Sequence, residues 1–202
     1  MTELKNAQKL RDKFRELAME HANDISVARK NYDLRRPRKP DDIKAEFVLN
    51  VMRTEDWSLG SVGIAFSGEP LDRLANDVTV KKLRDIFAQC QADGGLTSAT
   101  YAALVDEVTR VFTSSSSPYA NRIACYFDHR LGWLLCLNRM ESLIHEMKKH
   151  EIVDLTASLG KKWFELQMIV MPVLHELLGS GYDDVTIAFL MWMILDWLEH
   201  KK

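Results

Sequence analysis

The sequence predicts an all-α fold, a bundle of about eight helices around a central hydrophobic helix. Apolar residues recur every three or four positions along most of the chain, which is the spacing of a helix with one buried face. No strand-like alternation persists, and only nine glycines and five prolines interrupt the 202 residues. Residues 119–138 are apolar on most sides, which is typical of a helix at the centre of a bundle.

An amphipathic helix followed by a basic, proline-containing linker is predicted at the N-terminus. The helix covers residues 3–31, and its apolar face consists of Leu4, Ala7, Leu10, Phe14, Leu17 and Ala18. Pro37 and Pro40 lie in the linker, where proline removes a backbone donor and disfavours helix in the preceding residue. We therefore predict two parts: an N-terminal helix with its linker in residues 1–41, and a helical bundle in residues 42–202.

Two further helices are predicted before the middle of the chain. Asp41 and Asp42 can cap the first of them, because carboxylates accept the unpaired N–H groups of a helix start. A glycine-containing connection then leads to Pro70, whose fixed φ suits the first turn of the next helix. That helix is expected to run without interruption to Gly94 and Gly95.

The remaining helices follow from similar signals. Thr97 or Ser98 is expected to cap the helix that ends near Phe112, and Pro118 opens the central hydrophobic helix. The other predicted helices are two short ones within residues 139–159, one over residues 163–178 and a last one from Asp183 to His200.

Charge, cysteine content and hydropathy restrict the class of protein. Residues 1–41 hold eleven basic and seven acidic residues, and the remainder holds sixteen and twenty-two, which is typical of solvated faces rather than of nucleic-acid binding. Three cysteines without close spacing favour a reducing compartment over a disulfide framework or a zinc site. The charged N-terminus and the lack of a long apolar run predict a cytoplasmic chain without a secretory signal or spanning helix.

A short motif in the third predicted helix carries the functional prediction. Leu71 and Leu74 share an apolar helix face and are followed by the small residue Ala75 and the polar pair Asn76 and Asp77. This pattern resembles the death-helix motif, Bcl-2 homology motif three, of the Bcl-2 family of apoptosis regulators.

Other segments resemble the same family in the expected order, over residues 42–192. Residues 42–53 are similar to the family's first homology helix. The run from Tyr119 to Arg122, followed by the aromatic pair at 126 and 127, resembles homology motif one, which contains an arginine. The 42 residues from Leu71 to Phe112 match a typical member without an insertion.

The resemblance implies a Bcl-2-like bundle with an apolar groove that binds the amphipathic death helix of a pro-apoptotic partner. In this family pattern Arg122 pairs with the aspartate of the bound helix, since a planar guanidinium can hold a carboxylate in two hydrogen bonds. The resemblance places these residues near the groove: Val78, Ile86, Val108, Val111, Arg122 and Phe127. It implies no catalytic residue, metal or cofactor.

Several alternatives remain open. Ala75-Asn76 stands where executioner members of the Bak/Bax type carry Gly-Asp, which favours a pro-survival receptor over an executioner. Family members usually end in an apolar membrane anchor, which this sequence lacks; association with the mitochondrial outer membrane through a missing anchor is one alternative, and a homodimer is another. Outside the family, two alternatives are a helical adaptor and a helical ribonuclease. In the ribonuclease, His145 would act as acid or base and Arg139 would stabilise phosphate charge.

Overall fold

The computed structural model describes residues 2–53, 69–112, 117–133, 135–179 and 181–200 of the chain. These residues form helices, turns and irregular connections but no strand, which confirms the predicted all-α class. The chain divides into two compact units: a terminal unit of Met1–Arg29 with Arg130–Lys202, and a middle unit of Lys30–His129. The boundary that we predicted near residue 41 falls inside the middle unit.

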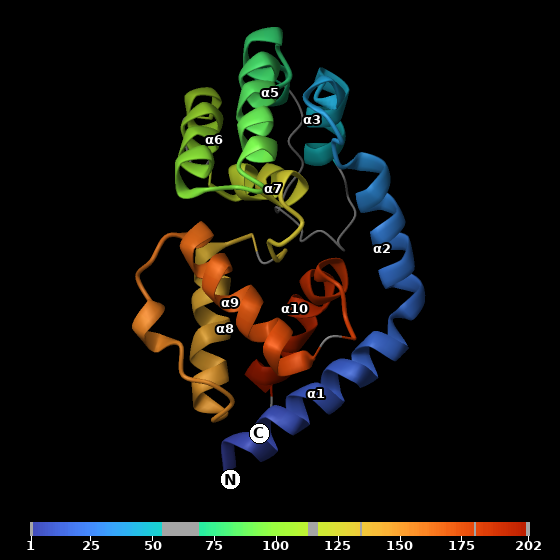
Figure 1. The fold of residues 1–202 in the computed structure, drawn as a ribbon, viewed down its shortest axis with the longest axis vertical. Helices are drawn as coiled ribbons and strands as arrows, with labels where there is room; N and C mark the ends of the chain where they lie inside the picture. Colours follow the sequence, from blue (N-terminus) through green and yellow to red (C-terminus); the bar gives the residue numbers. More distant parts are fainter. Residues whose placement is uncertain (1, 54–68, 113–116, 134, 180, 201–202) are drawn as a thin grey trace. The chain divides into compact units, whose positions relative to one another are not determined.

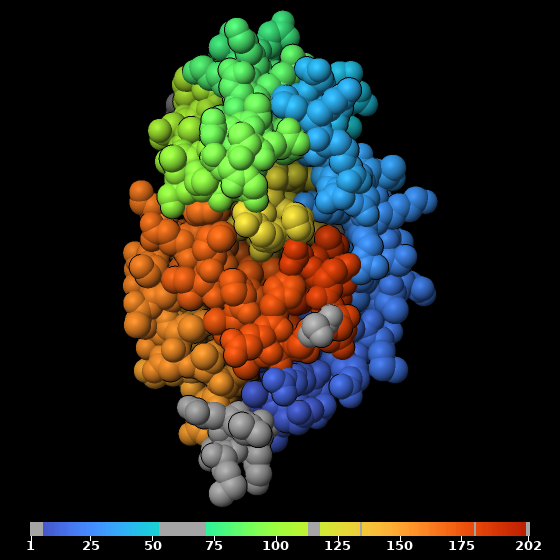
Figure 2. Space-filling view, viewed as in Figure 1, coloured from blue at the N-terminus to red at the C-terminus, as the bar shows by residue number. Residues whose placement is uncertain are grey.

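The terminal unit joins the N-terminal helix to the C-terminal helices (Figure 1). Its elements are α1 (Thr2–Glu20), the first part of α2 (Ala22–Arg35), α8 (Leu137–Lys149), the 3-10 turn η3 (Thr156–Ser158), α9 (Trp163–Leu178) and α10 (Asp184–His200). Both α1 and α8 pack against α9 and α10. In Figure 2 the blue surface of α1 adjoins the red surface of α10.

The core of the terminal unit forms where α1 meets α9 and α10. Leu10 and Phe14 of α1 are each 1% exposed and lie against Leu174 of α9 and Ile194 of α10. The ring of Phe14 also meets that of Tyr182 edge-on, with the centroids 4.7 Å apart. Burial of this face explains why the N-terminal segment is amphipathic.

The helix predicted over residues 3–31 is two helices in the structure. His21 lies in a turn that separates the two helices, although its N–H still donates to the carbonyl of Leu17 at 2.9 Å. The second of these helices, α2, continues to Arg35, at the start of the proline-containing linker.

The break between α9 and α10 matches the predicted one. Gly179 ends α9 with φ 85, a left-handed conformation that glycine adopts without steric cost. Asp183 then accepts the N–H of Thr186 at 2.9 Å, which caps the start of α10. The same carboxylate binds Arg29 of α2 at 2.7 Å.

The middle unit surrounds one short helix. After the end of α2 its described elements are the 3-10 turn η1 (Pro40–Asp42), α3 (Ala45–Arg53), α4 (Glu69–Leu74), α5 (Asp77–Ala92), α6 (Ser98–Val111) and α7 (Ser117–Phe127). Helix α7 packs against α3 and α6, and every residue from Tyr119 to Phe127 is buried. It therefore has the all-round burial that we predicted for a central helix.

This central helix is much shorter than predicted, because α7 ends at Phe127 instead of continuing to residue 138. Asp128 leaves the helix and its carboxylate accepts the N–H of Leu96 at 2.9 Å. The described residues 128–133 and 135–136 are not helical, and α8 begins only at Leu137. The apolar residues before Asp128 thus lie in a helix of the middle unit, whereas Leu131, Trp133 and Leu135 lie in an irregular connection of the terminal unit.

One predicted helix cap is confirmed and another is wrong. Thr97 caps α6, since its hydroxyl accepts the N–H of Thr100 at 3.2 Å. Asp42, in contrast, does not cap the next helix but belongs to the 3-10 turn η1. Its carboxylate accepts hydrogen bonds from the N–H groups of Arg38 and Lys39 at 2.8 and 3.0 Å. These backbone hydrogen bonds lower the pKa of Asp42.

Candidate functional site

The six residues predicted to line a groove all belong to the middle unit, and most of them lie in its interior. Arg122 is 2% exposed, and Val108, Val111 and Phe127 are also buried. Ile86 is half-buried, whereas Val78 is 61% exposed. Arg122 therefore has almost no surface from which to contact a partner helix in this conformation.

The segment that resembles a death helix is not one continuous helix. Helix α4 ends at Leu74, which is fully buried, and Ala75 lies in a turn. The side chain of Asn76 then accepts the N–H of Thr79 at 2.9 Å and so caps α5, in which Asp77 is the first residue. The prediction of a single amphipathic helix through this motif is wrong, because an Asx residue here starts a new helix. The side chain of Leu71 lies outside the described residues.

Polar contacts from three helices hold α7 in place. The hydroxyl of Tyr101 lies 2.5 Å from Asn121 Oδ1, and the hydroxyl of Tyr32 donates to the carbonyl of Cys125 at 3.0 Å. The thiol of Cys90 points to the carbonyl of Phe127 at 3.7 Å. Burial raises the pKa of Tyr32, Tyr101 and Cys125. These groups are neutral and internal, which indicates a structural role.

An exposed surface of the middle unit combines apolar and basic side chains; we call it the α5–α6 patch. It contains Val78, Lys82 and Ile86, which share one face of α5 at four-residue spacing, and Arg110 of α6. Lys82 Nζ lies 3.0 Å from a carboxylate oxygen of Glu107, and Arg110 Nη2 lies 2.5 Å from the other.

Arg110 also connects this ion cluster to the start of α5. Its guanidinium also donates to the hydroxyl of Thr79 at 2.9 Å, and Thr79 directly follows Val78. Glu107 is 5% exposed, while the side chains of Lys82 and Arg110 remain about half exposed. Burial alone would raise the pKa of Glu107, but the hydrogen bonds from Arg110 and Lys82 lower it. Two cations therefore face one carboxylate, and the cluster keeps a net positive charge.

Phe127 lines a smaller hollow of the middle unit, with a volume of about 270 Å³. Two of its arginines already form contacts within the unit. Arg36 Nε lies 3.2 Å from the carboxylate of Asp33, and Arg36 Cζ lies 5.8 Å from the ring centroid of Tyr32. Arg38 also faces Asp33, at 3.6 Å. These contacts favour an ion cluster within the fold rather than a ligand site.

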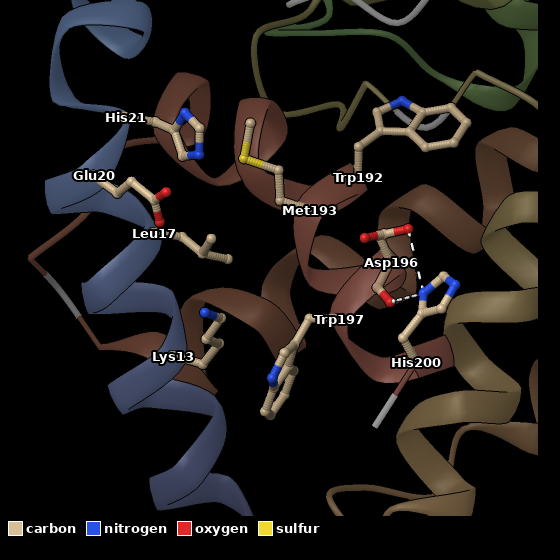
Figure 3. Close-up of a pocket in the computed structure, with 9 residues that line it drawn as sticks. All are labelled: Lys13, Leu17, Glu20, His21, Trp192, Met193, Asp196, Trp197 and His200. Atoms are coloured by element: carbon tan, nitrogen blue, oxygen red, sulfur yellow. Dashed lines mark hydrogen bonds and ion pairs between the residues drawn. The ribbon is translucent and has the colours of Figure 1, made fainter. Parts of the chain in front are cut away.

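A larger hollow lies in the terminal unit between α1 and α10; we call it the α1–α10 hollow (Figure 3). Its volume is about 630 Å³, and its apolar surface comes from Leu17 of α1 and from Trp192, Met193 and Trp197 of α10. The sequence shows these residues only as parts of two apolar helix faces. The hollow could not be predicted, because it requires α1 to lie beside a helix from the opposite end of the chain.

Charged groups line the same hollow. Lys13 binds Glu16 at 2.8 Å, within α1. On α10, His200 Nδ1 lies 2.7 Å from the carbonyl and 3.4 Å from the carboxylate of Asp196, and these contacts raise the pKa of His200. Glu20, in contrast, has no ion-pair partner among the described residues.

The described residues do not bring Arg139 and His145 together on one face. No group of three or more histidine, cysteine, aspartate or glutamate side chains among them could hold a metal ion. Arg139 lies over the ring of Trp192 at 5.3 Å and binds Glu199 at 3.3 Å, whereas His145 is exposed on another face of α8. None of the described helices has the length and apolar character needed to traverse a bilayer.

Comparison of the chain with protein-family models, with curated proteins and with solved structures finds no match. Function is therefore inferred from the residues and their surroundings. Among the described residues, the α5–α6 patch and the α1–α10 hollow combine exposed apolar with charged side chains.

Proposed function

We propose that this chain is an apoptosis regulator of the Bcl-2 type, without catalytic chemistry, that captures amphipathic death helices of partner proteins. The ordered motifs over residues 42–192 support the proposal, as do the all-helical fold and the buried central helix α7. The observation that carries it is the α5–α6 patch, where Val78 is 61% exposed and the guanidinium of Arg110 donates to the hydroxyl of the next residue, Thr79.

The patch has the chemistry that a death helix requires. Such a helix presents apolar anchors at i, i+3 or i+4, and i+7, together with a carboxylate. Val78 and Ile86 can receive the anchors, and each fully buried aliphatic side chain contributes roughly 1.5–3 kcal/mol before ordering costs. Lys82 and Arg110 provide the positive charge beside them.

Arg110 suits the role of carboxylate receptor better than Arg122 does. Arg122 is buried within the middle unit, whereas the side chain of Arg110 is 47% exposed. A guanidinium carries five N–H donors, so Arg110 can keep its contacts with Glu107 and Thr79 and still bind a partner's aspartate. Arg122 is then a structural residue of α7.

The way in which the motif is used in the chain's own fold supports a pro-survival role. Leu74 is fully buried and the side chain of Asn76 caps α5, so the motif does not present a continuous apolar helix to another protein. A receptor needs no exposed death helix, whereas an executioner does. Release of a dye from lipid vesicles by the purified chain would favour the executioner alternative instead.

Calorimetric titration of the whole chain with a helical peptide of the pattern Leu-x-x-x-Gly-Asp tests the proposal. Val78→Glu and Arg110→Glu should each weaken binding by roughly tenfold or more, because they remove an anchor contact and reverse the charge of the receptor. Leu34→Glu is a matched control: Leu34 is also exposed and in the same unit, but lies on α2. Absence of binding by the wild-type chain, or equal effects of all three changes, would contradict the proposal.

A further inference from the structure

The α1–α10 hollow plays no part in the proposed function, since it belongs to the terminal unit. It lies between α1 and α10, and Leu10 and Phe14 of α1 line a separate, much smaller cavity with Ile194 of α10. Trp192, Met193 and Trp197 remain partly exposed on its α10 side. Adjacent aromatic and sulfur-containing side chains that are left partly open to solvent are typical of surfaces that bind a partner.

Two carboxylates face each other across this apolar floor. Figure 3 shows the side chain of Glu20 reaching into the hollow from α1 and that of Asp196 from α10, with Met193 and Trp197 between and beside them. The lysine of the hollow, Lys13, is already neutralised by Glu16 at 2.8 Å. The side chain of Asp196 is 76% exposed and also lies 3.4 Å from His200 Nδ1, which balances part of its charge. Glu20 is the carboxylate of the hollow that has no ion-pair partner among the described residues.

We infer that the α1–α10 hollow binds an amphipathic helix of a partner protein that carries a lysine or arginine between its apolar anchors. The basic side chain lies between Glu20 and Asp196, and the apolar anchors contact Met193 and Trp197. The charges on α1 and α10 determine which partner helix is preferred. Glu20 and Asp196 attract a cationic side chain and repel an acidic helix.

The indole rings strengthen this preference for a basic partner. A cation over the face of a tryptophan is attracted by the ring's negative charge density. The fold already contains one such contact on this helix, where the guanidinium of Arg139 lies 5.3 Å from the ring of Trp192. A partner's basic side chain at Trp197 would repeat that arrangement within the hollow.

Fluorescence anisotropy with two labelled peptides tests the inference on the whole chain. The first peptide is helical, with leucines at i, i+4 and i+7 and a lysine at i+3; its twin carries glutamate in place of the lysine. We expect the wild-type chain to bind the lysine peptide and to bind its glutamate twin at least roughly tenfold more weakly. The double variant Glu20→Lys, Asp196→Lys should reverse that order.

A charge-matched variant separates the hollow from the overall charge of the protein. Asp12→Lys with Glu176→Lys changes the net charge by the same amount at exposed positions outside the hollow, and should leave both affinities unchanged. Equal binding of the two peptides by the wild-type chain would overturn the inference, as would a loss of preference in the control variant. Self-association that the Glu20→Lys, Asp196→Lys variant abolishes would show that a second copy occupies the hollow, and would also overturn it. Failure here leaves the proposed function intact, because Val78→Glu tests that in the middle unit.

Discussion

The side-chain amide of Gln167 pairs with both backbone polar groups of Gly132, although the two residues are 35 positions apart in sequence. Gln167 Oε1 accepts the N–H of Gly132 at 2.9 Å, and its Nε2 donates to the carbonyl of Gly132 at 3.2 Å. Both residues are buried. A carboxamide on α9 therefore forms hydrogen bonds with the backbone N–H and C=O groups of an irregular segment inside the terminal unit, where water does not reach the backbone.

Gln167→Leu should destabilise the terminal unit by about 2–3 kcal/mol, because it removes both hydrogen bonds from this side chain to the buried backbone of Gly132. Chemical denaturation followed by tryptophan fluorescence is the appropriate measurement, since four of the five tryptophans belong to this unit. Met168→Leu is the control: Met168 is the next residue of α9 and is 41% exposed, so its change should be nearly neutral. An equal effect of the two substitutions would show that the pairing contributes nothing to stability.

Gly132→Ala should also destabilise the unit, by about 1–3 kcal/mol, because the added methyl group overfills a packed site. A Cβ at this position would overlap Met191 Sδ and lie 2.9 Å from Met171 Sδ. Gly181→Ala should be neutral or slightly stabilising, since a Cβ there meets nothing within 4 Å.

A double-mutant cycle identifies the cause of the Gly132 effect. If the clash with Met191 is responsible, Gly132→Ala should cost less in a Met191→Ala background than in the wild type. Strictly additive free energies of unfolding would point instead to the backbone of Gly132.

The end of α7 illustrates what periodicity could predict and what it could not. The apolar character of residues 119–138 correctly indicated a buried segment, and Tyr119–Phe127 is indeed a central helix. A helical pattern cannot show where such a segment stops when the residues after the break are equally apolar. The contacts that form the break come from Leu96 and Gln167, which are 32 and 35 positions away from their partners.

The candidate site was partly predictable for a similar reason. The family resemblance singled out Val78, which the structure exposes, and Ile86, which is half-buried, and also Val108 and Arg122, which are buried. Helix periodicity identifies an apolar face but not whether that face meets the core or the solvent. Arg110 was missed, because its importance arises from its contacts with Glu107 and Thr79 in three dimensions.

Asn76 has a testable role that differs from the one its motif implies. Asn76→Ala should destabilise the middle unit by about 1 kcal/mol, because the N–H of Thr79 loses its acceptor at the start of α5. Asn76→Asp should retain the stability, since aspartate caps helices about as well as asparagine does. Urea unfolding followed by circular dichroism measures both. A neutral Asn76→Ala would contradict the assignment of this residue as a cap.

Acid should weaken the middle unit through Glu107, whose pKa in the fold is below its ordinary value of 4.5 because of Arg110 and Lys82. A carboxylate with a lowered pKa contributes stability that is fully present above its unfolded pKa and is lost as the pH falls through the folded one. Glu107→Gln should therefore reduce stability by about 1–3 kcal/mol at pH 7 and make it less dependent on pH between about 5 and 3. Asp106→Asn, an exposed neighbour on α6, is the control and should keep the wild-type slope. Urea unfolding gives the free energy of unfolding at each pH in this range. If that free energy changes with pH equally in the wild type and in Glu107→Gln, the ion cluster does not lower the pKa of Glu107.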